Sequence, residues 1–246
     1  ILVTAAPEII YAEDKDGDGK ADNEAAGEKI VLYRGFGEGN QQHRVNGLRW
    51  GLDNWLHVGN GDSGGVIRSL TSGLLREGEA PAEPQRREGQ EVNVAGRDLR
   101  IRPDTGELEA TSGNTQFGRE TDDWGNWFGN NNSIIGWHYW LPLRYLEQNP
   151  AIAVKATRET LNNEKEIFPV SPPVRRFNWA SATNTLTSGC APIPYRDSTF
   201  GDDGKDVLFI CEPANNLVHR EVLDYTQSPI TSHRHKADAG SEFIAS

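Results

Sequence analysis

The sequence predicts an all-β fold made of many short strands. A 3.6-residue apolar period is nearly absent, short apolar runs alternate with Gly, Asp and Asn, and glycine fills 26 of the 246 positions. We expect strands at residues 8–11, 29–33, 55–58, 91–94, 137–141 and 207–211, and short helices in the insertions at 144–149 and 155–163. Short strands separated by turns are typical of a sandwich, a barrel or a propeller.

A degenerate internal repeat favours the propeller. A Gly- or Asp-containing turn leads into an aromatic or aliphatic strand and then to asparagine, at residues 51–60, 123–130 and 203–216. Aligned on Trp55, Trp127 and Val207, the copies lie 72 and 80 residues apart. Since a blade takes roughly 40 to 50 residues, each interval holds one blade with an insertion or two compact blades. One polar insertion, residues 74–91, has no apolar face and predicts a surface loop.

The charge balance excludes one class of partner. Lys and Arg number 25 against 36 Asp and Glu, which gives a net charge of -11 and a pI near 5.0. A general phosphate-backbone binder needs a basic face, so we expect no nucleic-acid partner. No stretch approaches the roughly 18 to 20 apolar residues of a transmembrane helix. Because the chain lacks methionine and opens on Ile1, we expect a processed chain or a piece of a longer protein.

A glycine-containing run near the amino terminus carries aspartates at alternating positions and one more four residues later: Asp14, Asp16, Asp18 and Asp22. Calcium prefers six to eight oxygen ligands on a tightly turning backbone, and this spacing supplies carboxylates on one side of a loop. Ala25 occupies the position where an EF-hand has its bidentate glutamate, so an EF-hand itself is not expected. We expect a structural calcium ion here, and the alternative is a solvated hairpin turn.

Cys190 and Cys211 are too few for a disulfide scaffold or a zinc site. Each flanks an apolar run, residues 191–195 and 207–210, and a hairpin centred near Gly201 places the two thiols close to opposite each other. Two outcomes stay open. One is a cross-strand disulfide, which fits an extracytoplasmic compartment, and the other is a pair of buried thiols.

His43 stands in the loop before the first copy of the repeat. In a propeller, such a loop opens onto the central face, where ligands collect, and an imidazole is suited to take a proton from an alcohol. From chemistry alone, the alternative is a hydrogen-bonded structural histidine. The pattern His43, Leu48, Gly51 and Asp53, followed by residues 61–64, resembles the soluble quinoprotein glucose/sorbosone dehydrogenases, which are six-bladed β-propellers. In that family, the residue before the histidine is an Asp that orients the ring, whereas here it is Gln42.

This resemblance implies that His43 is the catalytic base and that pyrroloquinoline quinone is a cofactor. Six blades of the usual size need roughly 250 to 300 residues. The fold expected for residues 1–246 is therefore a partial six-bladed β-propeller, with about four to five blades of four-stranded antiparallel sheet.

A longer resemblance runs from end to end apart from the insertion. The chain is similar to the large bacterial family described as membrane-bound dehydrogenases, at residues 7–22, 37–48, 96–106, 122–126 and 211–222. Members usually continue into helical repeats and a cytochrome c-like domain with a CxxCH haem motif. No CxxCH occurs here, so we expect no covalent haem in this chain. The resemblance implies a periplasmic or secreted protein, associated with the membrane through parts outside this chain, whose partners are the missing blades and the cytochrome c-like domain.

A second His-Arg pair follows the third copy of the repeat. If His219 and Arg220 face the central cleft, Arg220 and Arg44 hold an anionic ligand in a fork geometry. The alternative is a strand end that is ion-paired with Glu221. Four tryptophans crowd a short span, for which we expect blade-to-blade packing, with a sugar-stacking platform as the alternative: Trp124, Trp127, Trp137 and Trp140.

These observations predict a propeller segment of an exported quinoprotein-type dehydrogenase that oxidises a sugar or an alcohol. The substrate loses a proton to His43 and a hydride to the quinone, while Arg44, His219 and Arg220 bind substrate or cofactor. The alternative function is a non-catalytic propeller module that binds polysaccharide or partner domains, because a fold does not by itself imply a function.

Overall fold

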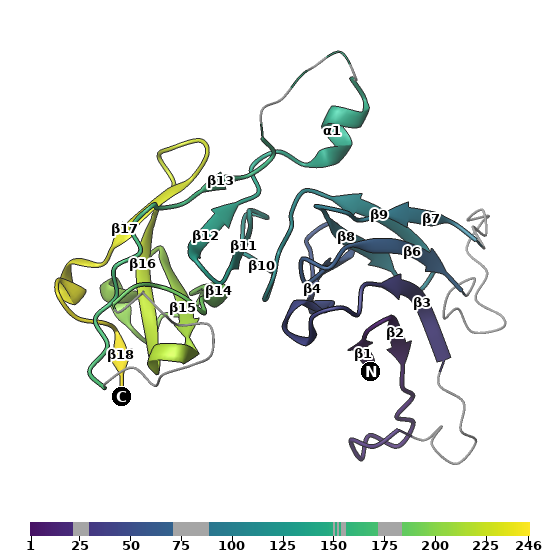
Figure 1. The fold of residues 1–246 in the computed structure, drawn as a ribbon, viewed down its shortest axis with the longest axis horizontal. Helices are drawn as coiled ribbons and strands as arrows, with labels where there is room; N and C mark the ends of the chain where they lie inside the picture. Colours follow the sequence, from purple (N-terminus) through teal and green to yellow (C-terminus); the bar gives the residue numbers. More distant parts are fainter. Residues whose placement is uncertain (22–29, 71–88, 150, 152, 154–155, 172–183) are drawn as a thin grey trace. The chain divides into compact units, whose positions relative to one another are not determined.

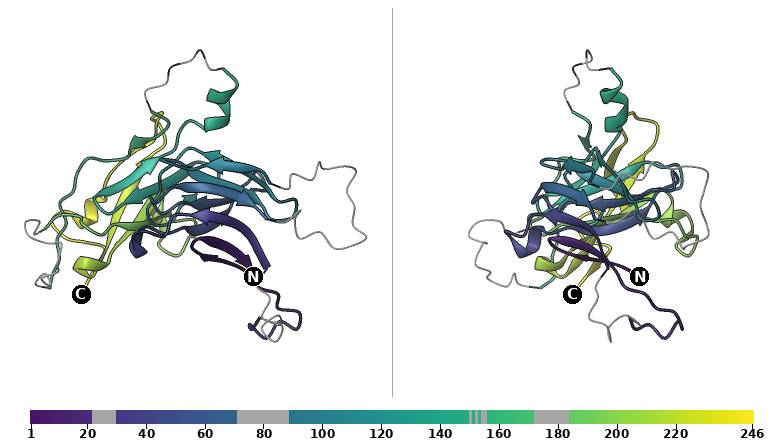
Figure 2. Two further views of the ribbon diagram at one scale, coloured as in Figure 1. Left: turned by 45° about the vertical axis from the view of Figure 1, so that its right-hand side comes forward. Right: turned by 90° about the vertical axis from the view of Figure 1, so that its right-hand side faces the viewer.

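The structure is a computed structural model that describes residues 1–21, 30–70, 89–149, 151, 153, 156–171 and 184–246. These residues form four antiparallel sheets of four or five strands, whose strands lie side by side in Figures 1 and 2. The chain divides into two compact units, Ile1–Thr111 and Ser112–Ser246, each holding two of the sheets. The all-β prediction is confirmed, and the arrangement is that of a partial β-propeller-like fold.

The first unit contains two sheets that share one core. One sheet has the order β1-β2-β3-β6-β7, with β1 (Leu2–Ala5), β2 (Glu8–Tyr11), β3 (Ile30–Phe36), β6 (Gly65–Ser69) and β7 (Glu91–Asn93). The other has the order β4-β5-β8-β9, with β4 (Asn46–Trp50), β5 (Leu56–Gly59), β8 (Asp98–Arg102) and β9 (Glu107–Thr111). Ile9, Leu32 and Ile67 of the first sheet belong to the same buried cluster as Val58 and Leu99 of the second.

The second unit repeats this plan. One sheet consists of β10 (Glu120–Thr121), β11 (Trp127–Asn131), β12 (Ile134–His138) and β13 (Glu159–Thr160). The other consists of β14 (Cys190–Pro194), β15 (Val207–Glu212), β16 (Leu217–Asp224) and β17 (Thr231–Arg234), and β18 (Ile244–Ala245) also pairs with β16. Phe128 and Ile135 of the first sheet share a buried cluster with Leu208, Ile210 and Leu223 of the second.

Helices are few and short in the described residues. One α-helix, α1 (Leu143–Glu147), lies where the sequence predicts the first of two helices. Four 3-10 turns are η2 (Gln41–His43), η3 (Gly201–Gly204), η4 (Pro213–Asn215) and η5 (Lys236–Asp238). No helix in this part of the chain is long and apolar enough to cross a membrane.

The prediction of a helix at residues 155–163 is wrong for the described part of this segment, residues 156–163. Glu159 and Thr160 form strand β13 and pair with His138 and Trp137. The amide of Leu161 continues the pairing by donating to Gly136 O at 2.9 Å, and its side chain enters the core. Tertiary packing thus outweighs the local helical propensity of this segment. Of the predicted insertion 74–91, residues 74–88 lie outside the described residues, and Glu91 is the first residue of β7.

The asparagine that ends each copy of the repeat is buried. Asn60, Asn130 and Asn215 are 0%, 0% and 2% exposed. Asn60 bonds to Val94 O and Asn130, once its amide is flipped, bonds to Phe117 O, while Asn215 bonds to Glu212 three residues earlier. The repeat therefore marks a structural position, at which a buried amide is hydrogen-bonded within its own unit.

The four tryptophans do not behave alike. Trp137 is buried, as core packing requires, and the Arg158 guanidinium lies 3.9 Å from its ring centroid. Trp124 is 71% exposed, so the expectation of core packing is wrong for this residue. Its ring and the ring of Tyr225 form a T-shaped pair with a centroid distance of 5.2 Å.

Candidate functional site

His43 ends the 3-10 turn η2 between β3 and β4 in the first unit. Asn40 caps this turn, because its side chain accepts from Gln42 N at 3.0 Å and its carbonyl accepts from His43 N at 2.9 Å. The His43 side chain is 28% exposed. The imidazole is therefore held on an ordered turn and still reaches solvent, as a proton acceptor must.

Asp62 supplies a carboxylate to this histidine from a different loop. Its Oδ2 lies 4.0 Å from His43 Nδ1, and its backbone has a φ of 68°, which is uncommon for a residue other than glycine. The neighbouring Ser63 hydroxyl donates to His43 O, so residues 62 and 63 contact both the ring and the backbone of the histidine. Gln42 replaces the expected Asp before the histidine, and Asp62 is the carboxylate that the fold brings near the ring.

Asn60 fixes the loop that carries Asp62. Its Oδ1 accepts from Asp62 N at 2.5 Å, and its Nδ2 donates to Val94 O at 2.8 Å and to Arg97 O. The next residue, Gly61, packs so closely that an added Cβ would overlap the carbonyl of Arg44. The Asp62 loop and the His43 turn are therefore in close backbone contact.

Arg44 has a guanidinium that is only partly engaged. One terminal nitrogen donates to Glu38 O at 3.2 Å, while the buried Nε has no hydrogen-bond partner among the described residues. No carboxylate within this part of the chain forms an ion pair with Arg44. Arg44 follows His43 directly in the chain, and a guanidinium suits an anionic or carbonyl group of a ligand.

Asp53, another residue of the dehydrogenase-like pattern, belongs to a structural ion cluster. Its Oδ2 lies 3.3 Å from Nε2 of the buried His57 and 2.8 Å from the Arg100 guanidinium. Burial acts to raise the pKa of Asp53, but His57 and Arg100 outweigh it and hold that pKa well below its usual range. Arg100 also bonds Glu109 and lies over the Trp55 ring, at 4.4 Å from the centroid.

His219 and Arg220 lie in the second unit and are both buried in ion pairs. His219 Nδ1 is 2.8 Å from Glu242 and Nε2 is 2.8 Å from Glu221, while Arg220 forms a bidentate pair with Asp238 at 2.8 and 2.7 Å. These contacts favour the ion-paired alternative, with Glu242 and Asp238 as partners in addition to Glu221. A ligand-binding role shared by Arg44 and Arg220 stays a prediction.

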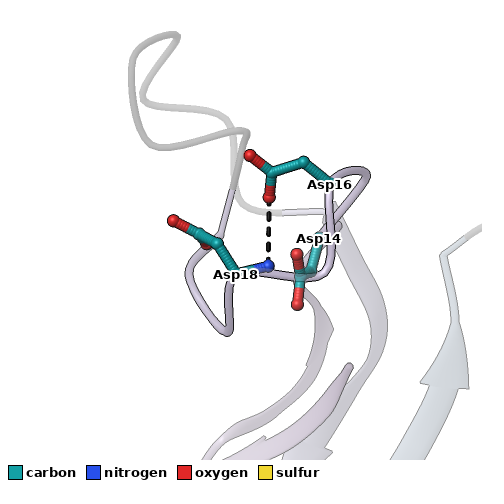
Figure 3. Close-up of side chains that lie close together, drawn as sticks. All are labelled: Asp14, Asp16 and Asp18. Carbon is teal, nitrogen blue, oxygen red and sulfur yellow. Dashed lines mark hydrogen bonds between the residues drawn. The ribbon is translucent and has the colours of Figure 1, made fainter.

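The acidic loop brings three of its four predicted ligands together. Oxygens of Asp14, Asp16 and Asp18 lie within 4.8 Å of one another (Figure 3), and Asp22 lies outside the described residues. Asp14 accepts from the amides of Gly17 and Gly19 at 2.8 and 3.1 Å, which folds the loop around its carboxylate.

A family model described as a domain of unknown function, DUF7133, matches residues 1–246. The chain belongs to the DUF7133 family. No curated protein and no solved structure matches it. The DUF7133 match covers both units, so the His43 turn and the buried ion pairs of the second unit lie within one family domain.

The hairpin expected in the DUF7133 chain is confirmed, with its cysteines in register. Cys190 of β14 pairs directly with Cys211 of β15, and both are free thiols in the structure. Cys211 is exposed and Cys190 is half-buried, so the alternative of two buried thiols is wrong for Cys211. Burial and the neighbouring Cys211 raise the pKa of the Cys190 thiol to about 11.

Two functional candidates were not expected from the sequence. Asp62 stands within the dehydrogenase-like pattern, but only the fold brings it beside His43. Glu242 comes from the segment before β18, and no local pattern links it to His219. The one signal for Asp62 is its place in the run of residues 61–64, where glycines on either side indicate a tight turn.

Proposed function

We propose that this DUF7133 chain is the propeller segment of an exported quinoprotein-type dehydrogenase that oxidises a sugar or an alcohol, with His43 as general base. The observation that supports it is the partly exposed His43, which has the Asp62 carboxylate 4.0 Å from its Nδ1 and is followed in the chain by Arg44. A base, a group that orients it and a cation for the developing negative charge are what removal of a hydroxyl proton requires.

In this proposal His43 Nε2 takes the hydroxyl proton while Nδ1 faces Asp62. The carboxylate stabilises the imidazolium that forms, and Arg44 stabilises the alkoxide oxygen or holds a carboxylate of the cofactor. Pyrroloquinoline quinone, when bound, supplies the acceptor for the hydride that leaves the carbinol carbon.

The proposal also has a cellular setting. The protein acts in the periplasm or outside the cell, and its electrons pass to a cytochrome c-like domain outside this chain. The remaining blades of the ring and that domain are its macromolecular partners, and the substrate is a small sugar or alcohol.

A reconstitution assay tests the proposed function. We expect the natural full-length protein, loaded with pyrroloquinoline quinone and calcium, to reduce a redox dye in the presence of at least one member of a panel of aldoses, polyols and primary alcohols. Omission of the quinone is the matched control and abolishes the signal. A loaded protein that binds the quinone and reduces no dye with any of them contradicts the proposal.

Exposed side chains favour the second candidate, a polysaccharide-binding module. Trp50 and Leu52 at the β4–β5 turn are 59% and 71% exposed, and an exposed indole can stack on a sugar ring. If this function is the real one, affinity electrophoresis in polysaccharide gels shows retardation that Trp50→Ala abolishes. Val66→Ala, at an exposed aliphatic residue of the same unit, is the control and leaves retardation unchanged.

We also propose a structural calcium ion in the acidic loop. Oxygens within 4.8 Å of one another fit a cation with ligands at roughly 2.3–2.6 Å, because opposite ligands then lie about 5 Å apart. Asp14, Asp16 and Asp18 would hold the ion, together with backbone carbonyls or water.

Calcium is therefore expected to raise the melting temperature of the chain. At a hundredfold excess over the dissociation constant we expect a rise of about 5 °C or more, followed by differential scanning fluorimetry with and without chelator. The variant with Asp14→Asn, Asp16→Asn and Asp18→Asn should lose the response, since the amides leave no charge to bind the ion. A wild-type melting temperature that is the same with calcium and with chelator contradicts this site.

A further inference from the structure

Cys190 and Cys211 face each other across the first strand pair of the last sheet. The register places the two residues directly opposite in the antiparallel pair β14–β15. Directly opposed residues in such pairs have Cα atoms about 4.5–5.5 Å apart, and disulfides span Cα distances of about 4.4–6.8 Å. The Cα separation expected for directly opposed residues therefore lies within the range that a disulfide spans.

Several hydrogen bonds hold the backbone around Cys190. Glu212, the residue after Cys211, accepts from Thr187 N at 3.2 Å and from Ser188 N at 2.8 Å. Gly189 N donates to Asn132 O at 3.0 Å and Ala191 N donates to Phe117 O at 3.1 Å. The backbone on both sides of Cys190 is thus held in place. This lowers the entropic cost of forming a disulfide at this residue.

Strand β14 is the edge strand of its sheet and has the sequence CAPIP. Proline is tolerated in edge strands because its nitrogen can face away from the neighbouring strand. The register shifts between Cys190 and Ile193, and Ala191 has a φ of 50°. The regular pairing with β15 is therefore interrupted beside Cys190, and a covalent bond at residue 190 would fix the register there.

We propose that Cys190 and Cys211 are a disulfide-forming pair that fastens edge strand β14 to β15. The exposed Cys211 thiolate attacks a disulfide oxidant, either a thiol oxidoreductase or a small-molecule disulfide, and forms a mixed disulfide. The Cys190 sulfur then attacks Cys211 Sγ and releases the second thiol of the oxidant. The two cysteines lose two protons and two electrons in total, and the oxidant is reduced to two thiols. This inference is independent of the dehydrogenase proposal.

The experiment uses the purified chain incubated with oxidised or with reduced glutathione. After alkylation under denaturing conditions, intact mass spectrometry should show that the oxidised sample has lost two hydrogens and takes up no alkyl group, while the reduced sample takes up two. Proteolysis without reduction should yield one cross-linked peptide pair containing Cys190 and Cys211. The oxidised chain should melt at least about 5 °C above the reduced chain.

A control variant separates the cross-link from other effects of the oxidant. With Cys190→Ser and Cys211→Ser together, the melting temperature should be the same in both forms of glutathione. Because the mass and peptide readouts need only the wild-type chain, the test stands even where the variant folds poorly. Glutathione retained on Cys211, a cross-link between two chains, or both thiols alkylated after oxidation would overturn the proposal.

Discussion

Replacing His219 by leucine is expected to lower the free energy of unfolding by about 3–5 kcal/mol at neutral pH. The side chains of His219, Glu221 and Glu242 are 1%, 0% and 0% exposed. Removing the imidazole leaves two buried carboxylates without the cation between them. Arg234 forms an ion pair with Glu242, so it compensates the charge of that glutamate and not the charge of Glu221. Denaturant unfolding followed by tryptophan fluorescence measures the change.

The matched control is His233→Leu, on the exposed side of β17. A surface substitution of this kind usually changes stability by less than about 0.5 kcal/mol. A His219→Leu chain that is as stable as His233→Leu would show that the Glu221–His219–Glu242 network contributes nothing to the fold.

The same network gives stability a defined pH dependence. Although burial opposes each shift, the hydrogen bonds that His219 donates to Glu221 and Glu242 raise its pKa above 6.5 and lower the pKa of both glutamates below 4.5. The histidine contribution is complete below pH 6.5 and is lost as pH rises through the raised pKa. The glutamate contribution is complete above pH 4.5 and is lost as pH falls through the lowered values.

The stability difference between wild type and His219→Leu should therefore be largest between about pH 4.5 and 6.5. Urea unfolding midpoints measured across pH 4–10 test this. A difference that grows steadily towards alkaline pH would contradict a protonated His219 in the folded chain.

Replacing Asn60 by alanine is the second change with a large expected effect, a loss of about 2–4 kcal/mol. The fully buried amide bonds Val94 O, Arg97 O and Asp62 N, and alanine leaves all three groups without this partner. Because Asn60 also positions the loop of Asp62, the variant should lose dye-reducing activity at temperatures where it is still folded.

Asn40→Ala is the control for this prediction. Asn40 is exposed and caps the His43 turn through one side-chain hydrogen bond. Losing that bond should lower the free energy of unfolding by no more than about 1 kcal/mol. Thermal unfolding by circular dichroism compares the two variants. Equal melting temperatures would contradict the structural role assigned to the buried asparagine.

The strands were predictable from the sequence because their signal is local. Residues 8–11 and 207–211 alternate or run apolar between turn residues, and strands form at Glu8–Tyr11 and Val207–Glu212. A helix was wrongly predicted at residues 155–163 because helical propensity is a local property. The pairing of Glu159 with His138 depends instead on a strand that is distant in sequence. The repeated asparagines were visible as a pattern, but their burial depends on the loops that pack over them.

The candidate site was predictable only in part. His43 and the facing cysteines follow from position in the repeat and from hairpin symmetry. Asp62 beside His43, and Asp238 and Glu242 beside Arg220 and His219, result from loops that fold back onto distant strands. Sequence spacing holds no information on such contacts, so the ligand-facing and the ion-paired alternatives for Arg220 both stayed open, and its partner Asp238 was not expected.

Substrate-dependent dye reduction by the quinone-loaded full-length protein carrying His43→Gln measures whether His43 acts as the base. We expect kcat/KM to fall by about 10²–10⁴-fold, because glutamine keeps a polar side chain but cannot take the proton. Asp62→Asn should cause a smaller loss, since it leaves the base in place, and both variants should melt within a few degrees of wild type. A His43→Gln protein that oxidises the same substrate at the wild-type rate would contradict the assignment of His43 as the base.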